Sequence, residues 1–285
     1  MHAEAESAAP RIIYRHRLPV RIMHWINVAS FFVMLMSGLA IFNAHPHLYW
    51  GKESHFKTPL LSITSRPGPQ REPRGITQVA GHTFDTDGLL GASRVEGDAA
   101  PSPRAFPSWA TIPGRQSLAM ARNWHLFFAW IFVLNGLAYV AFAILSGHLR
   151  RDLVPSAAEL RHIGRSIKDH LCLKHPSGEA ARRYNVLQNL AYLIVIFALL
   201  PLIVVAGMAM SPRLDALFSG GWVDLLGGRQ SARTLHFIAA FSLVGFVIVH
   251  VFEVIVTGLW NNLRSMVTGH YTLPAERHPA PEQPP

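Results

Sequence analysis

The sequence predicts an all-α fold: an integral membrane four-helix bundle with both termini cytoplasmic and a long periplasmic loop between the first two helices. Three observations carry this prediction. Of the 285 residues, 50% are hydrophobic and 15% are charged, whereas ordinary soluble domains carry about 25% charged residues. The apolar residues gather in four blocks, each as long as the roughly 20 residues that cross a bilayer as a helix. Lysine and arginine lie mainly between the blocks.

The helices can be placed from the apolar blocks. The predicted spans are about 22–43, 124–147, 186–210 and 234–260. The first follows Pro19, which suits a helix start, and it has no early small-residue cleavage site, so we expect a retained helix and not a signal peptide. Pro201 removes one hydrogen bond inside the third span, which predicts a kink that a membrane bundle tolerates.

Basic residues predict the orientation of the spans. Four arginines precede the first block, and six arginines and two lysines lie in the connection 148–185. The connection before the last block carries only Arg213, Arg229 and Arg233. Since basic loops stay in the cytoplasm, both termini and 148–185 are expected on that side of a single membrane domain, 1–285.

The outer connection, about 44–123, is rich in glycine, proline and serine, as in SRPGPQREPRG (65–75) and GDAAPSPRAFPSW (97–109). This composition predicts an extended or irregular insertion and not a packed domain. Because long insertions are often functional, we expect a docking surface here. The proline-rich segment 274–285 predicts a disordered tail.

Composition also excludes several classes of protein. One cysteine, Cys172, permits no intrachain disulfide, cysteine-rich zinc site or iron–sulfur cluster, and no C-x-x-C-H motif is present, so any haem is held non-covalently. The net charge of +9 could suggest nucleic acid. However, the basic residues are dispersed between apolar blocks, so membrane topology explains them and no nucleic acid is expected.

Four of the sixteen histidines fall inside the predicted spans: His24, His125, His236 and His250. An ionisable group in the membrane indicates function, although any one alone could be a core histidine bonded to a neighbouring helix. His236 and His250 share one face of a helix and lie roughly 21 Å apart along it. The alternating helix directions pair His125 with His236 on the outer side and His24 with His250 on the inner side. Each pair supplies two imidazoles that could clamp a haem iron.

Glycines and arginines near these histidines are further candidates for haem contact. Gly38 and Gly136 lie near the histidine faces, where glycine allows a haem to approach the backbone; plain helix packing is the alternative. Arginine pairs well with carboxylates, so Arg21, Arg122 and Arg233 could hold haem propionates. Snorkelling or topogenic arginines explain them equally well.

The inner end of the predicted bundle is polar enough to bind a quinone. Gln188 starts the third span, and Glu253 lies one turn after His250. A quinone headgroup needs hydrogen-bond partners and a proton path beside a redox centre, and a buried carboxyl group can supply both. The alternative is that Glu253 pairs with a basic loop residue or with the surroundings of the inner haem.

These motifs resemble those of a known family. His24-Trp25 opening the first helix, RNWH (122–125) opening the second and ARTLHFIAAFSLVGFVIVH (232–250) are similar to bacterial di-haem b-type cytochromes, which include cytochrome b561 and the cytochrome b subunits of hydrogenase, formate dehydrogenase and thiosulfate reductase. FPSWATIP (106–113), YNVLQNLAY (184–192) and MAMSP (208–212) resemble a branch partnered with molybdopterin-containing, sulfite-oxidase-like proteins. The long outer loop and the inner connection depart from shorter members.

The resemblance implies two haem b groups in a bacterial inner-membrane protein that transfers electrons between quinone and a periplasmic redox partner. That partner could be a molybdopterin or hydrogenase catalytic subunit or a c-type cytochrome, with the chain as its electron-transfer subunit. One alternative is a stand-alone quinol oxidase that reduces a small acceptor such as superoxide. A membrane anchor and a metal transporter are the non-redox alternatives.

Overall fold

The computed structural model describes residues 11–55, 57–95, 97–161, 163–171, 186–219 and 221–273. Two compact units share the chain. The first, here called the insertion unit, consists of 25–137 and 199–243. The second, the terminal unit, consists of 1–24, 138–198 and 244–285. Each long helix contributes residues to both units.

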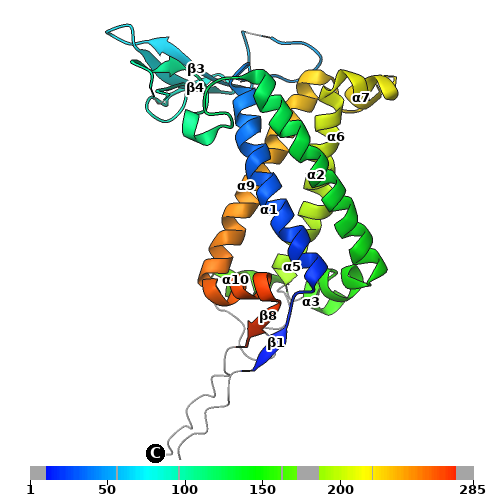
Figure 1. The fold of residues 1–285 in the computed structure, drawn as a ribbon. Helices are drawn as coiled ribbons and strands as arrows, with labels where there is room; N and C mark the ends of the chain where they lie inside the picture. Colours follow the sequence, from blue (N-terminus) through cyan, green and yellow to red (C-terminus); the bar gives the residue numbers. More distant parts are fainter. Residues whose placement is uncertain are drawn as a thin grey trace, which may run out of the picture. The chain divides into compact units, whose positions relative to one another are not determined.

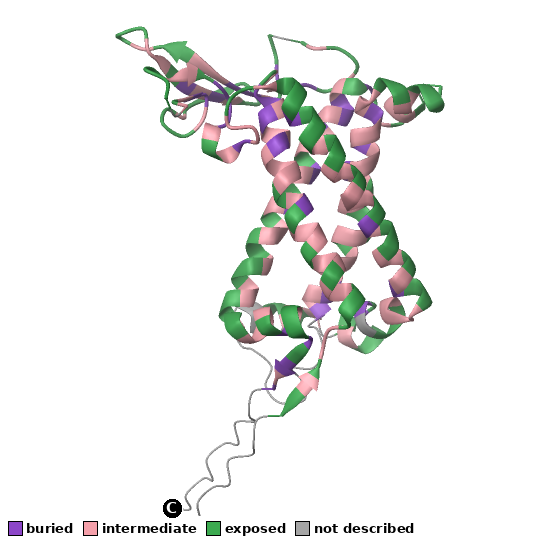
Figure 2. Ribbon diagram, viewed as in Figure 1, coloured by how far each residue is buried: buried purple, intermediate pink, exposed green. Residues whose placement is uncertain are grey.

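Among the described residues, four helices are long and apolar enough to cross a membrane, which confirms the predicted all-α membrane bundle. They are Leu18–Phe42 (α1), Leu118–Leu145 (α2), Val186–Met210 (α5, η4 and α6 in sequence) and Arg229–Val256 (α9). Their ends differ from the predicted ones by up to six residues, because apolarity marks the part of a helix in lipid and not its terminal turns. In each helix 11–22% of the apolar window is buried in protein, which leaves most of the surface for lipid (Figure 2).

The third span contains a local change of helix type. It runs from α5 (Val186–Ile194) through a π-helical turn, η4 (Val195–Leu199), into α6 (Leu200–Met210). Pro201 has no N–H to donate to the preceding turn, and the wider π turn lies directly before it. The proline therefore marks an irregularity within the span, as expected, without ending the helix.

The insertion 44–123 is folded, so the prediction of an irregular segment was wrong. Its four-stranded antiparallel sheet has the order β2-β3-β4-β5, and β6 and β7 form a further pair. The strands are β2 (His47–Leu48), β3 (Leu61–Pro67), β4 (Pro73–Val79), β5 (His82–Asp85), β6 (Ala92–Ser93) and β7 (Ser102–Pro103) (Figure 1). Glycine and proline are concentrated in the turns, while short β-branched runs such as Ile63-Thr64 and Ile76-Thr77 pair across β3 and β4. The overall composition of the insertion does not show that glycine- and proline-containing turns alternate with these short β-branched runs.

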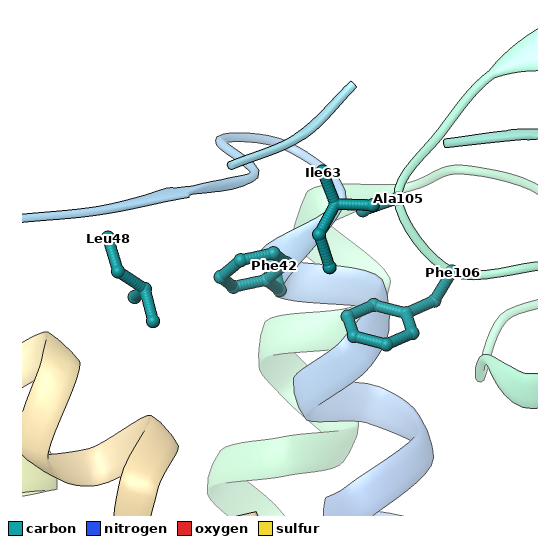
Figure 3. Packing of buried hydrophobic residues seen from close by; sticks show 5 residues of the cluster. All are labelled: Phe42, Leu48, Ile63, Ala105 and Phe106. Carbon is teal, nitrogen blue, oxygen red and sulfur yellow. The ribbon is translucent and has the colours of Figure 1, made fainter. Parts of the chain in front are cut away.

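A small core fixes the insertion to the end of α1. Phe42, Leu48, Ile63, Ala105 and Phe106 are buried together (Figure 3). Asn43 donates from Nδ2 to the Phe106 carbonyl (3.1 Å) and accepts from the Phe106 N–H (2.7 Å). Segments 63 residues apart in sequence are therefore held by both apolar and polar contacts.

Buried Arg104 connects neighbouring segments of the insertion by hydrogen bonds. Its guanidinium donates to the carbonyls of Phe106 and Gly114 and to the hydroxyl of Thr111. Burial lowers the pKa of Arg104, and the three acceptors compensate for the lost hydration.

The short helices α7 (Pro212–Leu217) and α8 (Gly221–Leu225) join α6 to α9.

In the terminal unit, the first and last described segments pair with each other. Strand β1 (Ile12–Tyr14) runs antiparallel to β8 (His270–Thr272) (Figure 1). Helix α10 (Leu259–Thr268) follows α9 after Gly258, whose φ of 112° ends the span. The two described ends thus lie together, which agrees with an even number of membrane crossings.

The connection between the second and third spans is partly described. It contains the π-helical turn η2 (Leu149–Leu153), α3 (Ala157–Arg161) and α4 (Ile163–Leu171). Residues 172–185, which include Cys172, and the predicted tail 274–285 lie outside the described residues.

Candidate functional site

The four histidines of the spans lie in two pairs. The ring centroids of His125 (α2) and His236 (α9) are 6.1 Å apart, with 62° between the ring planes. Those of His24 (α1) and His250 (α9) are 6.4 Å apart at 58°. The structure therefore brings together the pairs that the helix directions predict, each made of residues from two helices.

Hydrogen bonds fix the tautomer of both rings in the His125/His236 pair. The Nδ1 atom of His125 lies 3.0 Å from the carbonyl of Met34, and that of His236 lies 2.9 Å from the carbonyl of Ile203. A carbonyl only accepts, so Nδ1 carries the proton in each ring. Neutral imidazole then presents the lone pair of Nε2, which is the form that binds a metal.

Ser37 adds a second contact to His125. Its hydroxyl lies 2.6 Å from the Val33 carbonyl and 3.2 Å from His125 Nδ1. The hydroxyl donates to the carbonyl and can accept a share of the Nδ1 proton, as expected for a group that orients a metal-binding histidine. Ser37 itself is fully buried.

Glycines of neighbouring helices give these two rings their space. A Cβ at Gly38 (α1) would lie 3.4 Å from Cε1 of His125, and one at Gly207 (α6) would lie 3.2 Å from Cε1 of His236. Larger residues would displace the rings. Gly38 was predicted from sequence, although as a haem contact, whereas Gly207 was missed.

The spacing of both pairs suits one metal ion between two imidazoles. Metal–imidazole bonds are about 2 Å long and a ring centroid lies ~1 Å beyond its nitrogen, so two axial imidazoles have centroids about 6 Å apart. The observed 6.1 and 6.4 Å match this distance. Histidine is a common axial ligand of haem iron, so the donor set and its spacing fit a haem at each pair.

Aromatic side chains border the His24/His250 pair. The ring of Phe246, one turn before His250, stacks on it with a centroid distance of 5.9 Å and an interplanar angle of 13°. Tyr192 of α5 meets Phe246 edge-on at 6.2 Å. These rings limit the orientation of His250 by packing.

The three predicted arginines lie in different surroundings. Arg233, half-buried one turn before His236, donates to the His45 carbonyl and lies 5.6 Å from the centre of the Phe42 ring. Arg21 is half-buried, and its Nε has no hydrogen-bond partner within the described residues. Arg122 is exposed on α2. Arg21 and Arg233 are thus better placed than Arg122 for a buried carboxylate.

The candidate quinone residues belong to the terminal unit. Gln188 is half-buried in α5, and Glu253 is half-buried in α9, where its carbonyl accepts from Thr257 Oγ1 at 2.6 Å. Next to Gln188, Asn189 is buried, and its Oδ1 has no hydrogen-bond partner among the described residues.

Gly136, the second glycine predicted as a haem contact, lies on α2 in open surroundings. A Cβ at this position would meet no heavy atom of the described residues within 4 Å. The backbone of α2 is therefore accessible there, whereas Gly38 lies against a histidine ring.

An aromatic cluster of His45, His47 and Tyr49 follows α1. The rings of His45 and His47 have centroids 5.3 Å apart, and those of His47 and Tyr49 stack at 6.2 Å. Burial, followed by the charge of Arg233, lowers the pKa of both histidines, while burial raises the pKa of Tyr49. Both histidines lie outside the predicted spans, so the sequence analysis missed them; the signal available was their spacing around Tyr49.

Four membrane-capable helices and two imidazole pairs of this spacing define a membrane cytochrome of the b type. The chain belongs to the prokaryotic cytochrome b561 family, which matches residues 15–269. It is therefore a multi-pass inner-membrane protein that uses haem b in electron transport as an oxidoreductase subunit.

The chain is also similar to a curated protein. The putative protein-methionine-sulfoxide reductase subunit YedZ1 of Azospira oryzae is 34% identical to this chain over 174 residues, which cover 61% of this chain and 82% of the relative. No solved structure matches the chain.

Proposed function

We propose that the protein holds two haem b groups and transfers electrons between the quinone pool and a periplasmic redox partner. The main support for this proposal is the spacing of the two imidazole pairs, whose ring centroids are 6.1 and 6.4 Å apart. His125 and His236 hold one haem, and His24 and His250 hold the other. Each bound haem supplies one-electron chemistry, and two protein ligands on the iron favour electron transfer over oxygen binding.

The side chains around each pair have separate tasks in this proposal. The carbonyls of Met34 and Ile203 keep His125 and His236 in the metal-binding tautomer. Arg21 and Arg233 pair with haem propionates, since both guanidinium groups are half-buried near a histidine pair and arginine binds carboxylates well. Gly136 gives a haem room to approach α2.

Quinone chemistry belongs to the His24/His250 end. A quinol releases two electrons and two protons when it becomes a quinone, and haems held by the two histidine pairs would supply one-electron acceptors for it. Glu253 accepts or relays a proton there, while Gln188 binds the headgroup. The buried Asn189 Oδ1 supports a polar site at this end of α5.

The periplasmic partner is proposed to be a catalytic subunit that docks on the folded insertion 44–123. The relative from Azospira oryzae is named as a subunit of a protein-methionine-sulfoxide reductase, and the sequence resembles the branch with molybdopterin-containing partners. With both termini cytoplasmic, the insertion faces the periplasm and the His125/His236 pair is the nearer one to the partner.

Haem quantification tests the proposal. Pyridine haemochrome analysis of the purified protein should give two haem b per chain, and His125→Ala and His250→Ala should each give one. His82→Ala, on exposed β5, is the matched control and should keep two. One haem in the unmodified chain, or loss of both in each variant, would contradict the pairing.

A second experiment separates partner transfer from a stand-alone quinol oxidase. Protein reduced with duroquinol in proteoliposomes should be reoxidised by a purified methionine-sulfoxide reductase catalytic subunit with its substrate, and only slowly by superoxide. Glu253→Gln should slow reduction by duroquinol while both haems remain. Faster reoxidation by superoxide would favour the oxidase.

A further inference from the structure

A hollow of about 130 Å³ lies at the end of α2 in the terminal unit. Its lining consists of Arg17, Ser146, His148 and Arg151. Two of the four side chains are cationic arginines, and none is acidic. Among the described residues, no carboxylate lies within ion-pair distance of Arg17 or Arg151.

The backbone holds one wall of the hollow in place. Arg151 folds back over the end of α2, where its guanidinium donates to the carbonyls of Ser146 and Gly147. Gly147 has a φ of 69°, and a Cβ there would lie 2.8 Å from Arg151 Nη2. Glycine at this position therefore allows both the turn and the close approach of the guanidinium.

The surroundings of the hollow are positive. His16, next to Arg17 in sequence, has its pKa lowered to about 4 by burial and by nearby positive groups, among them Arg15, His148 and Arg21. Burial disfavours any charge, but the part of the lowering that comes from the neighbouring arginines reflects a positive potential, which favours an anion. Arginine forks match the oxygens of a phosphate group.

Apolar surface adjoins this cationic hollow. Ile144 and Leu145, which directly precede Ser146 in the last turn of α2, are 58% and 86% exposed. They belong to a helix that can cross a membrane, so their side chains face lipid. A ligand with a phosphate above hydrocarbon chains fits both parts, and basic pockets at cytoplasmic helix ends often bind acidic lipid headgroups.

We propose that this hollow binds the phosphate of an anionic phospholipid, whose acyl chains lie along Ile144 and Leu145. Arg17 and Arg151 contact the phosphate oxygens from two segments of the chain, and Ser146 and His148 complete the lining. The bound lipid connects the segment before α1 to the end of α2. Free inorganic phosphate offers the same oxygens without the chains.

Native mass spectrometry of the delipidated protein tests this assignment. The protein is titrated in parallel with dioleoyl phosphatidylglycerol, dioleoyl phosphatidylcholine and inorganic phosphate. We expect tighter binding of phosphatidylglycerol, and at least a tenfold weaker affinity in the double variant Arg17→Gln/Arg151→Gln. Arg150→Gln is the matched control, because Arg150 is exposed and outside the lining; its affinity should stay within twofold.

Three results would overturn the proposal. Equal binding of phosphatidylcholine would remove the role of headgroup charge, and an equal loss in Arg150→Gln would indicate unspecific surface charge. Displacement of the lipid by equimolar inorganic phosphate would identify a free-anion site. Haem content of the double variant is measured alongside: unchanged haem is expected, and a lost haem would assign these arginines to haem carboxylates.

Discussion

The two histidine pairs are nearly equal in spacing but differ in what orients their rings. His125 and His236 are fixed by hydrogen bonds to backbone carbonyls of α1 and α6, and a glycine of the same helix lies against each ring. His250 instead stacks on Phe246 of its own helix. The first pair therefore depends on how neighbouring helices pack, whereas the second depends more on side-chain packing. Changes in helix packing should affect the two sites unequally.

The largest expected effect comes from Gly207→Leu. Its side chain would displace the His236 ring, because even a Cβ would lie 3.2 Å from Cε1. With two haems bound as proposed, haem content should fall from two to about one per chain, and the haem at His24/His250 should be retained. Pyridine haemochrome analysis measures this, with Gly221→Leu as control because no heavy atom of a contacting described residue lies within 4 Å of its Cβ position. Two haems in Gly207→Leu would show that helix packing does not control the site.

Arg104→Met should destabilise the insertion. The change removes three charge-assisted hydrogen bonds, which costs about 3 kcal/mol or more. The Gly114 carbonyl and the Thr111 hydroxyl lose the guanidinium as donor, whereas the Phe106 carbonyl keeps its bond from Asn43. Thermal unfolding and limited proteolysis within 44–123 report the loss. Arg115→Met is the control, because its exposed ion pair with Asp98 (3.8 Å) is worth less than about 1 kcal/mol. Equal effects of the two changes would contradict the structural role of Arg104.

Ser37→Ala should change the reduction potential of the haem at His125/His236 and leave that of the haem at His24/His250 unchanged. The hydroxyl contact to His125 Nδ1 is removed while the Met34 bond remains, so the ligand becomes less electron-rich and the potential rises. A lost hydrogen bond of about 0.5–1.5 kcal/mol corresponds to roughly 20–60 mV for one electron. Potentiometric titration should show one shifted component; a shift of both would mean that the sites are not independently oriented. Ser30→Ala, on the same helix, is the control.

A smaller effect is expected from His16→Gln at the terminal end. The folded pKa of His16 is about 4 and the unfolded value is about 6.5, so between these values the unfolded chain binds a proton that the folded chain excludes. Stability therefore falls as pH drops through this window. Between about pH 7 and pH 4.5, the His16→Gln variant should lose less thermal stability than the unmodified protein. The control His82→Gln, at an exposed position, should lose as much as the unmodified protein. Identical pH slopes would contradict the burial of His16.

The sequence predicted the spans and the proximity of the histidine pairs, because apolar block length and alternating helix direction both follow from residue order. It did not predict the β-sheet of the insertion, since runs as short as Ile76-Thr77 are outweighed by the glycine and proline of the turns. The sequence also could not predict that the backbone carbonyls of Met34 and Ile203 accept hydrogen bonds from His125 and His236. A backbone carbonyl exists at every residue, so only the packing of helices decides which one meets a histidine.

The pairing of β1 with β8 has a practical consequence. Ile13 lies opposite Tyr271, so the two described ends of the chain emerge side by side. Reporter enzymes fused to either end should therefore report the same compartment, and a short peptide linker could join the ends into a circular chain reopened within a turn of the insertion. Such a permutant would separate the order in which the helices are synthesised from the arrangement that they finally adopt.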